Sequence, residues 1–122
     1  MKRKFKFRIW HNKSKRFLAE NEWYIAQDGL VFLEYFGELT CEEATIQQFT
    51  GELDKDGKEI YEGDILDFRF KEHGDMIHQK GEVFFEEGQF LICRSSLFSF
   101  PEIKVQNRTV IGDMIENKLT LL

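Results

Sequence analysis

The chain has 122 residues, a length that fits one domain burying about two-thirds of the surface of its unfolded chain. Hydrophobic residues make up 42% and charged residues 32%, which argues against disorder, and no apolar run is long enough to cross a bilayer. The basic start at residues 1–4 is not followed by an apolar segment, so we expect neither a signal peptide nor a membrane partner.

The net charge of −5 is unevenly distributed along the chain. Residues 1–16 contain eight Lys and Arg residues and no acid, whereas the other nine basic residues face all 22 acidic residues, which gives residues 17–122 a charge of −13. This asymmetry predicts an electrostatic partner for the N-terminal segment. Cys41 and Cys93 stand in no metal or redox spacing; a disulfide stays open, but free buried thiols in a cytoplasmic protein are the expectation.

The first third of the chain predicts a β-meander of three or four strands. Residues 4–10 alternate between apolar and basic side chains, which is typical of a half-buried strand. A return strand begins at residues 17–18, β-prone residues continue at 23–25, and residues 27–29 form a hairpin turn before the apolar run 30–36. Thirteen Phe residues favour a β-rich core.

The segment before the middle of the chain allows two interpretations. Thr40 with Glu43 fits a capping box and a short helix. Residues 45–50 alternate as a strand does, and we favour a strand from about Thr45 with at most one helical turn before it.

The most patterned stretch is residues 48–68. Residues 54–57 (Asp-Lys-Asp-Gly) predict a tight turn, and Gly63-Asp64 break the chain again before an apolar alternation. The acidic turn resembles a calcium loop with Gly57 at the sixth position, but the twelfth position, where a bidentate Glu is needed, falls on Gly63. A plain turn is therefore the better interpretation.

The second half predicts further short strands, which together indicate a small barrel or sandwich. We expect a strand over 64–70, a polar loop over 71–79, and a hairpin of residues 81–86 and 89–93 around Glu87-Gly88. Shorter strands are expected at Leu97-Phe98, 103–105 and 109–111, with Gly112 ending the last one and an apolar tail over 114–122.

Candidate catalytic and metal-binding residues are few. His73 and His78 flank Asp75 in the expected loop, but nothing supplies the further ligands of a structural zinc site. Cys93 lies in an apolar strand, and no Ser or Cys stands in a nucleophile motif. We expect no metal, no cofactor and no enzymatic activity, with a metal-dependent nuclease as a remote alternative.

The N-terminal strand is the main candidate binding surface. Lys4, Lys6 and Arg8 share one face, and Trp10 continues it. Basic residues with an exposed aromatic ring are how proteins follow a nucleic-acid backbone and stack on bases. The alternatives are protection of an edge strand, or contact of the basic strand with the acidic body of the fold or of a second subunit. We rank nucleic acid below these alternatives, because an acidic body repels phosphate.

Three segments resemble the YopX family of phage and prophage proteins. The central one is Thr50-Gly51 followed by residues 54–65 (DKDGKEIYEGDI), and residues 6–10 (KFRIW) and 110–113 (VIGD) with Glu116-Asn117 support it. The resemblance implies an SH3-like β-barrel in the second half, an N-terminal β-region packed against it, a phage or prophage origin, and oligomers. The family has no established catalytic residues to carry over.

The expected molecule is a single mainly-β domain, with an N-terminal β-region over 1–47 and a barrel-like region over 48–122. We expect a homo-oligomeric interaction or assembly module in the cytoplasm of a bacterial host. A protein partner is one candidate for it, and nucleic-acid binding through the basic strand is the alternative. Structural turns are expected at Gly51, Asp54, Asp56, Gly57, Gly63, Asp64 and Gly112. The expected core is Phe5, Phe7, Ile9, Val31, Leu33, Ile65, Phe84 and Ile111.

Overall fold

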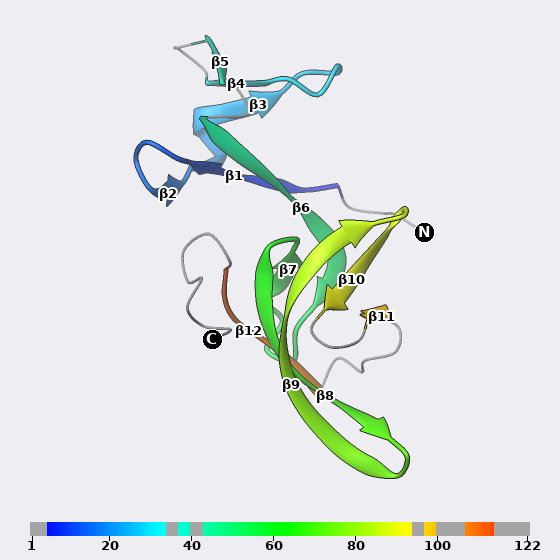
Figure 1. Ribbon diagram of the computed structural model, residues 1–122. Coiled ribbons are helices and arrows are strands. Elements are labelled where there is room, and N and C mark those ends of the chain that lie inside the picture. The colour runs from blue at the N-terminus through cyan, green and yellow to red at the C-terminus, as the bar shows by residue number, and fades with distance from the viewer. Residues whose placement is uncertain (1–4, 34–36, 40–42, 94–96, 100–106, 114–122) are drawn as a thin grey trace. The chain divides into compact units, whose positions relative to one another are not determined.

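The structure is a computed structural model that describes residues 5–33, 37–39, 43–93, 97–99 and 107–113. These residues form strands with antiparallel pairing and one short 3-10 helix, so the expected mainly-β class is confirmed (Figure 1). The chain divides into two compact units. The N-terminal unit is residues 6–48, and the C-terminal unit is residues 49–122 together with residues 1–5. Within the described ranges no helix has the length and hydrophobicity needed to span a bilayer.

The N-terminal unit contains two groups of paired strands. Its elements are β1 (Phe7–His11), β2 (Arg16–Phe17), η1 (Glu20–Glu22), β3 (Trp23–Ile25), β4 (Val31–Leu33), β5 (Gly37–Leu39) and the first half of β6 (Ala44–Leu53). Strand β1 lies between β2 and β6, and β3, β4 and β5 form a three-stranded sheet. The predicted hairpin turn joins β3 to β4, where Ala26 donates to the Leu30 carbonyl and Gly29 adopts a φ of 91°.

A small apolar core fills the N-terminal unit. Its buried members come from β1, from the residue after β2, from β4 and from β6: Ile9, Leu18, Val31 and Ala44. Trp23, Ile25 and Leu33 are partly buried against them. The alternation of β1 thus places Ile9 inside, as the sequence predicts.

The C-terminal unit is built on one curled antiparallel sheet. Its elements are the second half of β6, β7 (Glu59–Tyr61), β8 (Asp64–Glu72), β9 (Asp75–Glu86), β10 (Gln89–Cys93), β11 (Leu97–Ser99) and β12 (Arg108–Asp113). The five-stranded sheet has the order β11-β10-β9-β8-β12. Figure 1 shows β8 and β9 as long curved strands whose shared hairpin extends beyond the other strands of this sheet.

Strict alternation separates the two faces of this sheet. In β8 the side chains of Leu66, Phe68 and Phe70 are buried, while Arg69 and Lys71 between and after them are exposed. The buried face joins Ile60, Val83 and Ile92 in one apolar cluster, against which Ile77, Phe90 and Val110 pack. The opposite face points to solvent, so its polar residues are available for binding.

The predicted polar loop at 71–79 is wrong, because most of these residues belong to the β8–β9 hairpin. Glu72 pairs with Asp75, and the two-residue connection between them is His73-Gly74. Both have positive φ, 51° and 85°, which is the geometry of a type I′ turn. The strand pairing continues through these polar residues as far as Glu72 and Asp75. The turn is not recognisable from the sequence, because its first position is His73 and not the usual Asn or Asp. The predicted Glu87-Gly88 connection is confirmed, with φ values of 51° and 78°.

Three further expectations need correction. Phe5 is 64% exposed and Ile111 lies on the solvent-facing side of β12, so neither belongs to the core. Gly112 does not end a strand: β12 continues to Asp113, and the register shifts between Val110 and Gly112 as in a β-bulge. Glu43 lies in a turn and β6 begins at Ala44, so the expected short helix does not extend over these two residues. Residues 40–42, which include Cys41, lie outside the described residues, as do Lys4, residues 103–105 and the tail 114–122.

Candidate functional site

The basic N-terminal strand is described from Lys6 onward, and its side chains are engaged within its own unit. The Nε of Arg8 donates to Oε1 of Gln47 over 2.7 Å, and the Arg8 guanidinium lies 4.5 Å from the centre of the Phe17 ring. Trp10 is only 6% exposed and packs edge-on against Phe17, with 5.1 Å between the ring centres. The expectation of an exposed aromatic is therefore wrong for Trp10, because the ring from β2 covers it.

The acidic turn at residues 54–57, within the motif that resembles the YopX family, has a structural role. Asp54 is 2% exposed, and its Oδ1 accepts hydrogen bonds from the backbone N–H groups of Asp56 and Lys58, each 2.9 Å long. Its Oδ2 accepts a 3.0 Å bond from the N–H of Val110 in β12. Gly57 closes the turn with a φ of 83°. Both oxygens of Asp54 thus accept hydrogen bonds from backbone donors, which is the arrangement of a structural turn.

The protonation state of Asp54 follows from these contacts. Burial pushes its pKa up, but the backbone donors of Val110, Lys58 and Asp56, with the charge of Lys58, hold the net pKa below its usual value. The carboxylate therefore stays ionised as the hub that connects the turn to β12.

Arg108 is a second buried charged residue that connects distant segments, and the sequence analysis did not identify it. It is 2% exposed; its Nε donates to the Leu53 carbonyl over 2.9 Å, and its guanidinium pairs with Glu52 over 3.1 Å. Its own carbonyl accepts a bond from the N–H of Lys55. An Arg before a β-prone run carries no sequence signal for burial, because Arg is usually exposed.

Gly63 and Asp64 also form hydrogen bonds with backbone groups, as Asp54 and Arg108 do. Gly63 has a φ of 87° and donates to the Val83 carbonyl over 2.7 Å. The buried Asp64 accepts a 2.8 Å bond from the N–H of Tyr61. Gly51, by contrast, lies inside β6 at a register shift, with a φ of 90°, so it serves a bulge and not a turn.

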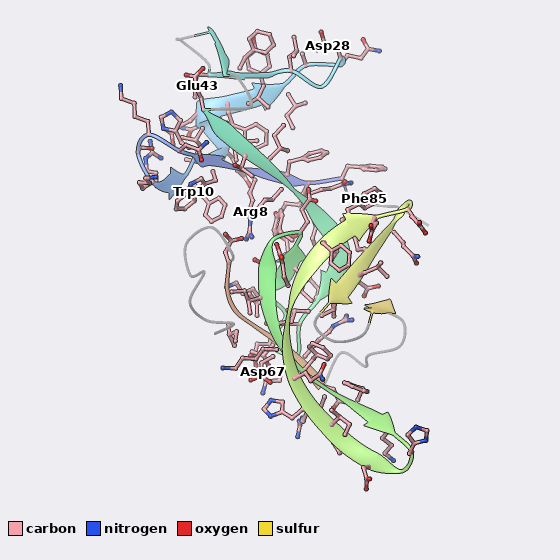
Figure 2. The ribbon with its side chains drawn as sticks, in the orientation of Figure 1. Arg8, Trp10, Asp28, Glu43, Asp67 and Phe85 are labelled. Atoms are coloured by element: carbon pink, nitrogen blue, oxygen red, sulfur yellow. The ribbon has the colours of Figure 1, made fainter. Side chains whose placement is uncertain are left out.

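A cavity opens on the solvent-facing side of β8, β9 and β12. It measures about 410 Å³, and we call the residues that line it the sheet-face site: Lys55, Asp67, Arg69, His78, Asn107, Thr109 and Ile111. Cross-strand pairing gathers them, since Arg69 lies opposite His78 and Asp67 lies opposite Thr109. Figure 2 shows Asp67 where these strands run together.

The charges of the sheet-face site are only partly paired. Asp67 hydrogen-bonds with Nε2 of His78. Among the residues that the structure describes, the side chains of Lys55 and Arg69 form no ion pair. Lys71 and Lys80 are exposed on the same face, next in the alternation along β8 and β9. The arrangement therefore favours an anionic ligand.

The histidines of the sequence analysis separate in the structure. His78 lies within β9 and lines the cavity, whereas His73 occupies the type I′ turn at the hairpin end. No group of three potential metal ligands is found within the described part of the chain.

Sequence reasoning missed the sheet-face site because its members lie far apart along the chain. One signal was available: the alternation Phe68-Arg69-Phe70-Lys71 marks a strand with a basic outer face. Recognising the cavity also requires knowing that β12 pairs with β8, and that contact joins residues about forty positions apart in the sequence.

Comparison with known proteins identifies a matching family and two solved structures with a similar fold. The family described as YopX protein matches residues 6–121. The crystal structure of protein EF1440 from Enterococcus faecalis is similar, with a TM-score of 0.69, 23% identity, and coverage of 97% of this chain and 98% of that one. The X-ray crystal structure of protein YopX from Bacillus subtilis has a TM-score of 0.64 and 19% identity, covering 95% and 96%. The comparison with curated proteins returned no match.

At these identities the two solved structures establish the shared fold alone. The family match, which covers nearly the whole chain, agrees with the motif around the Asp54 turn and with the strands at both ends. The chain belongs to the YopX family.

Proposed function

We propose that this protein is a non-enzymatic interaction module that binds an anionic macromolecular partner through the sheet-face site. The observation that carries the proposal is the presence of Lys55 and Arg69, without carboxylate partners among the described residues, beside a cavity on an acidic chain. Distant acidic groups do not cancel their attraction, because the Debye length is about 8 Å at physiological ionic strength.

The basic strand is the competing surface for such a partner. Its expected members are Lys4, Lys6, Arg8 and Trp10. Trp10 is buried, and the Arg8 guanidinium is held by Gln47 and Phe17, so binding there requires breaking contacts that already exist. The sheet-face site carries no such cost for Lys55 or Arg69, and we therefore place the binding function there.

Retention on immobilised heparin at pH 7 and low salt tests the proposal. A chain with a pI near 5.2 is expected to bind this polyanion only through a local basic surface. Replacing both Lys55 and Arg69 by Ala should lower the salt concentration needed for elution. The matched control, Lys13→Ala with Lys58→Ala, removes the same charge from two exposed positions outside the cavity and should elute close to the parent protein.

Unchanged elution of the Lys55→Ala, Arg69→Ala variant contradicts the proposal. Loss of retention on Lys4→Glu with Lys6→Glu, while the sheet-face variant binds normally, assigns the function to the basic strand instead.

Self-association is a second proposed function, and an exposed aromatic ring supports it. Phe85 is 51% exposed at the end of the β9–β10 hairpin, where its ring packs edge-on against Phe90 with 4.9 Å between the centres. Phe90 itself packs against the core, so Phe85 stands on a rigid base. Aromatic residues of this kind are enriched in the central part of protein interfaces.

Light scattering measures the predicted assembly directly. The parent protein should give a mass that is a multiple of 14.6 kDa, and Phe85→Ser should shift it toward the monomer. Leu30→Ser, which changes another exposed apolar side chain, serves as the control. A monomer at high protein concentration rejects assembly and leaves the anion-binding proposal standing.

We also propose that the C-terminal unit is an SH3-like barrel and that the protein is of phage or prophage origin and acts in the bacterial cytoplasm. The curvature of β8 and β9 supports the barrel (Figure 1). The bacterial sources of the two similar solved structures support the proposed host.

A further inference from the structure

We infer that the anionic partner of the sheet-face site is single-stranded nucleic acid, held by its phosphate backbone with one nucleotide in the cavity. This inference rests on the proposed function, since it names the class of anion that the same site takes. It is carried by the size of the cavity, the chemistry of its lining and the charges that continue from it.

The lining of the cavity suits a phosphodiester. Lys55 and Arg69 provide cationic donors, and Asn107 and Thr109 provide a neutral amide and a hydroxyl. Arg, Lys, Asn and Thr side chains are the groups that contact phosphate and sugar in nucleic-acid complexes. Asp67 is the one acid in the lining, and it is engaged in a hydrogen bond with His78.

The dimensions of the cavity favour a compact unit over an extended acidic chain. Its volume of about 410 Å³ lies within the range of sites that enclose small ligands, and one nucleotide is a ligand of that class. A Glu or Asp side chain of an acidic protein partner could pair with the exposed Arg69 without filling the cavity, so an acidic protein would not make use of this volume. Bases of a duplex are stacked and paired, whereas a single strand can place one unstacked nucleotide in a pocket.

Basic side chains next to the cavity can contact the neighbouring phosphates of the bound nucleic acid. Lys71 follows Arg69 on the same face of β8, about 7 Å further along the strand. Lys80 follows His78 on β9, opposite Asp67. The exposed ring of His78 offers a surface on which a base can stack, and the side chain of Ile111 offers an apolar contact beside it. A basic track with stacking surfaces is typical of proteins that bind single strands without sequence preference.

Fluorescence anisotropy with a labelled single-stranded DNA of about 12 nucleotides tests the inference, at salt concentrations between about 50 and 200 mM. We expect binding that weakens as salt rises. Lys55→Ala with Arg69→Ala should weaken it about tenfold or more and reduce the slope of log K against log salt by about 1.4. Lys13→Ala with Lys58→Ala should leave both values close to those of the parent protein.

Thr109→Val keeps every charge and should still lower the affinity, because it removes a neutral donor from the cavity. The thermal unfolding midpoint of each variant separates loss of binding from loss of folding.

Each other outcome overturns the inference. No binding to the single strand while heparin retention persists rejects nucleic acid and keeps the proposed function; loss of both in the folded parent protein rejects both. Tighter binding to the matching duplex than to the single strand, or competition by polyglutamate at equal charge concentration, assigns the site to a different partner. Binding that survives Lys55→Ala with Arg69→Ala but is lost on Lys4→Glu with Lys6→Glu moves the site to the basic strand.

Discussion

Asp54 shows how one buried carboxylate joins two distant parts of the chain. Its oxygens accept bonds from the turn that follows it and from Val110, 56 positions away. Buried hydrogen bonds to a charged group contribute about 1.5–3 kcal/mol each, and an unsatisfied donor carries a further cost. The most recognisable residues of the family motif therefore act on folding, which explains why the motif identifies a family without revealing chemistry.

Asp54→Asn should destabilise the protein by about 2–3 kcal/mol at pH 7, as measured by urea denaturation. One side-chain oxygen remains for Asp56 and Lys58, but the new amide group faces the N–H of Val110, so two donors oppose each other. Asp56→Asn is the matched control, because Asp56 is exposed, and it should change stability by less than about 0.5 kcal/mol.

The pH dependence of Asp54 has a definite sign. Its pKa is lower in the folded protein than in the unfolded chain, so its contribution is complete above the unfolded value of about 4 and is lost as the pH falls through the folded value. The difference between the parent protein and Asp54→Asn should thus shrink in acid. A difference that stays constant from neutral pH into acid contradicts the role assigned to the ionised carboxylate.

Glu82 shows the opposite effect. Burial raises its pKa, and the nearby charge of Asp113 raises it further. Its folded pKa lies above the unfolded value, so the favourable contribution is present below about pH 4 and is lost as the pH rises through the folded pKa. Glu82→Gln should therefore stabilise the protein slightly at pH 7, by no more than about 0.5 kcal/mol, because the side chain is partly in solvent. Thermal unfolding at pH 7 and in acid checks this, and a lower midpoint for the variant at pH 7 rejects it.

At the scale of elements, the sequence predicts strands better than connections. Alternation predicted β1 and β6, β-prone residues predicted β3, and the turn at Glu87-Gly88 predicted β10. Alternation failed for the end of the β8–β9 hairpin, where both faces carry polar residues and the turn reads His-Gly in place of Asn-Gly. The short strand β5 was not predicted, since its three residues include a Gly and no clear alternation.

Substitution of Gly74 tests the turn assigned to His73-Gly74 in the β8–β9 hairpin. Gly74 has a φ of 85°, and a Cβ at this position meets nothing within 4 Å, so the penalty for Ala is one of backbone conformation alone. Gly74→Ala should destabilise the protein by about 1 kcal/mol and loosen the outer part of β8 and β9, seen as faster amide exchange at residues 69–72. Gly74→Asn should be milder, because Asn tolerates the left-handed region. Equal exchange rates in the parent protein and Gly74→Ala contradict the assigned turn.

At the scale of the molecule, mainly-β architecture and family membership could be predicted from the sequence, but the candidate site could not. The sheet-face site depends on the register of three strands, and register is set by pairing between residues distant in sequence. The predicted basic strand rests on a local pattern, which reports charge but does not show that Phe17 covers Trp10. Local patterns thus give the strands, and tertiary pairing decides which side chains remain available.

We propose that partners bind on the solvent-facing side of β8, β9 and β12 and not along β1. Amide chemical shifts of the isotope-labelled protein, followed during titration with the single-stranded DNA at low salt, distinguish these two surfaces. We expect the largest shifts at Arg69, His78 and Thr109, with Arg8 and Trp10 unchanged. Shifts concentrated at Lys6, Arg8 and Trp10, or no shifts at any of these residues, would contradict it.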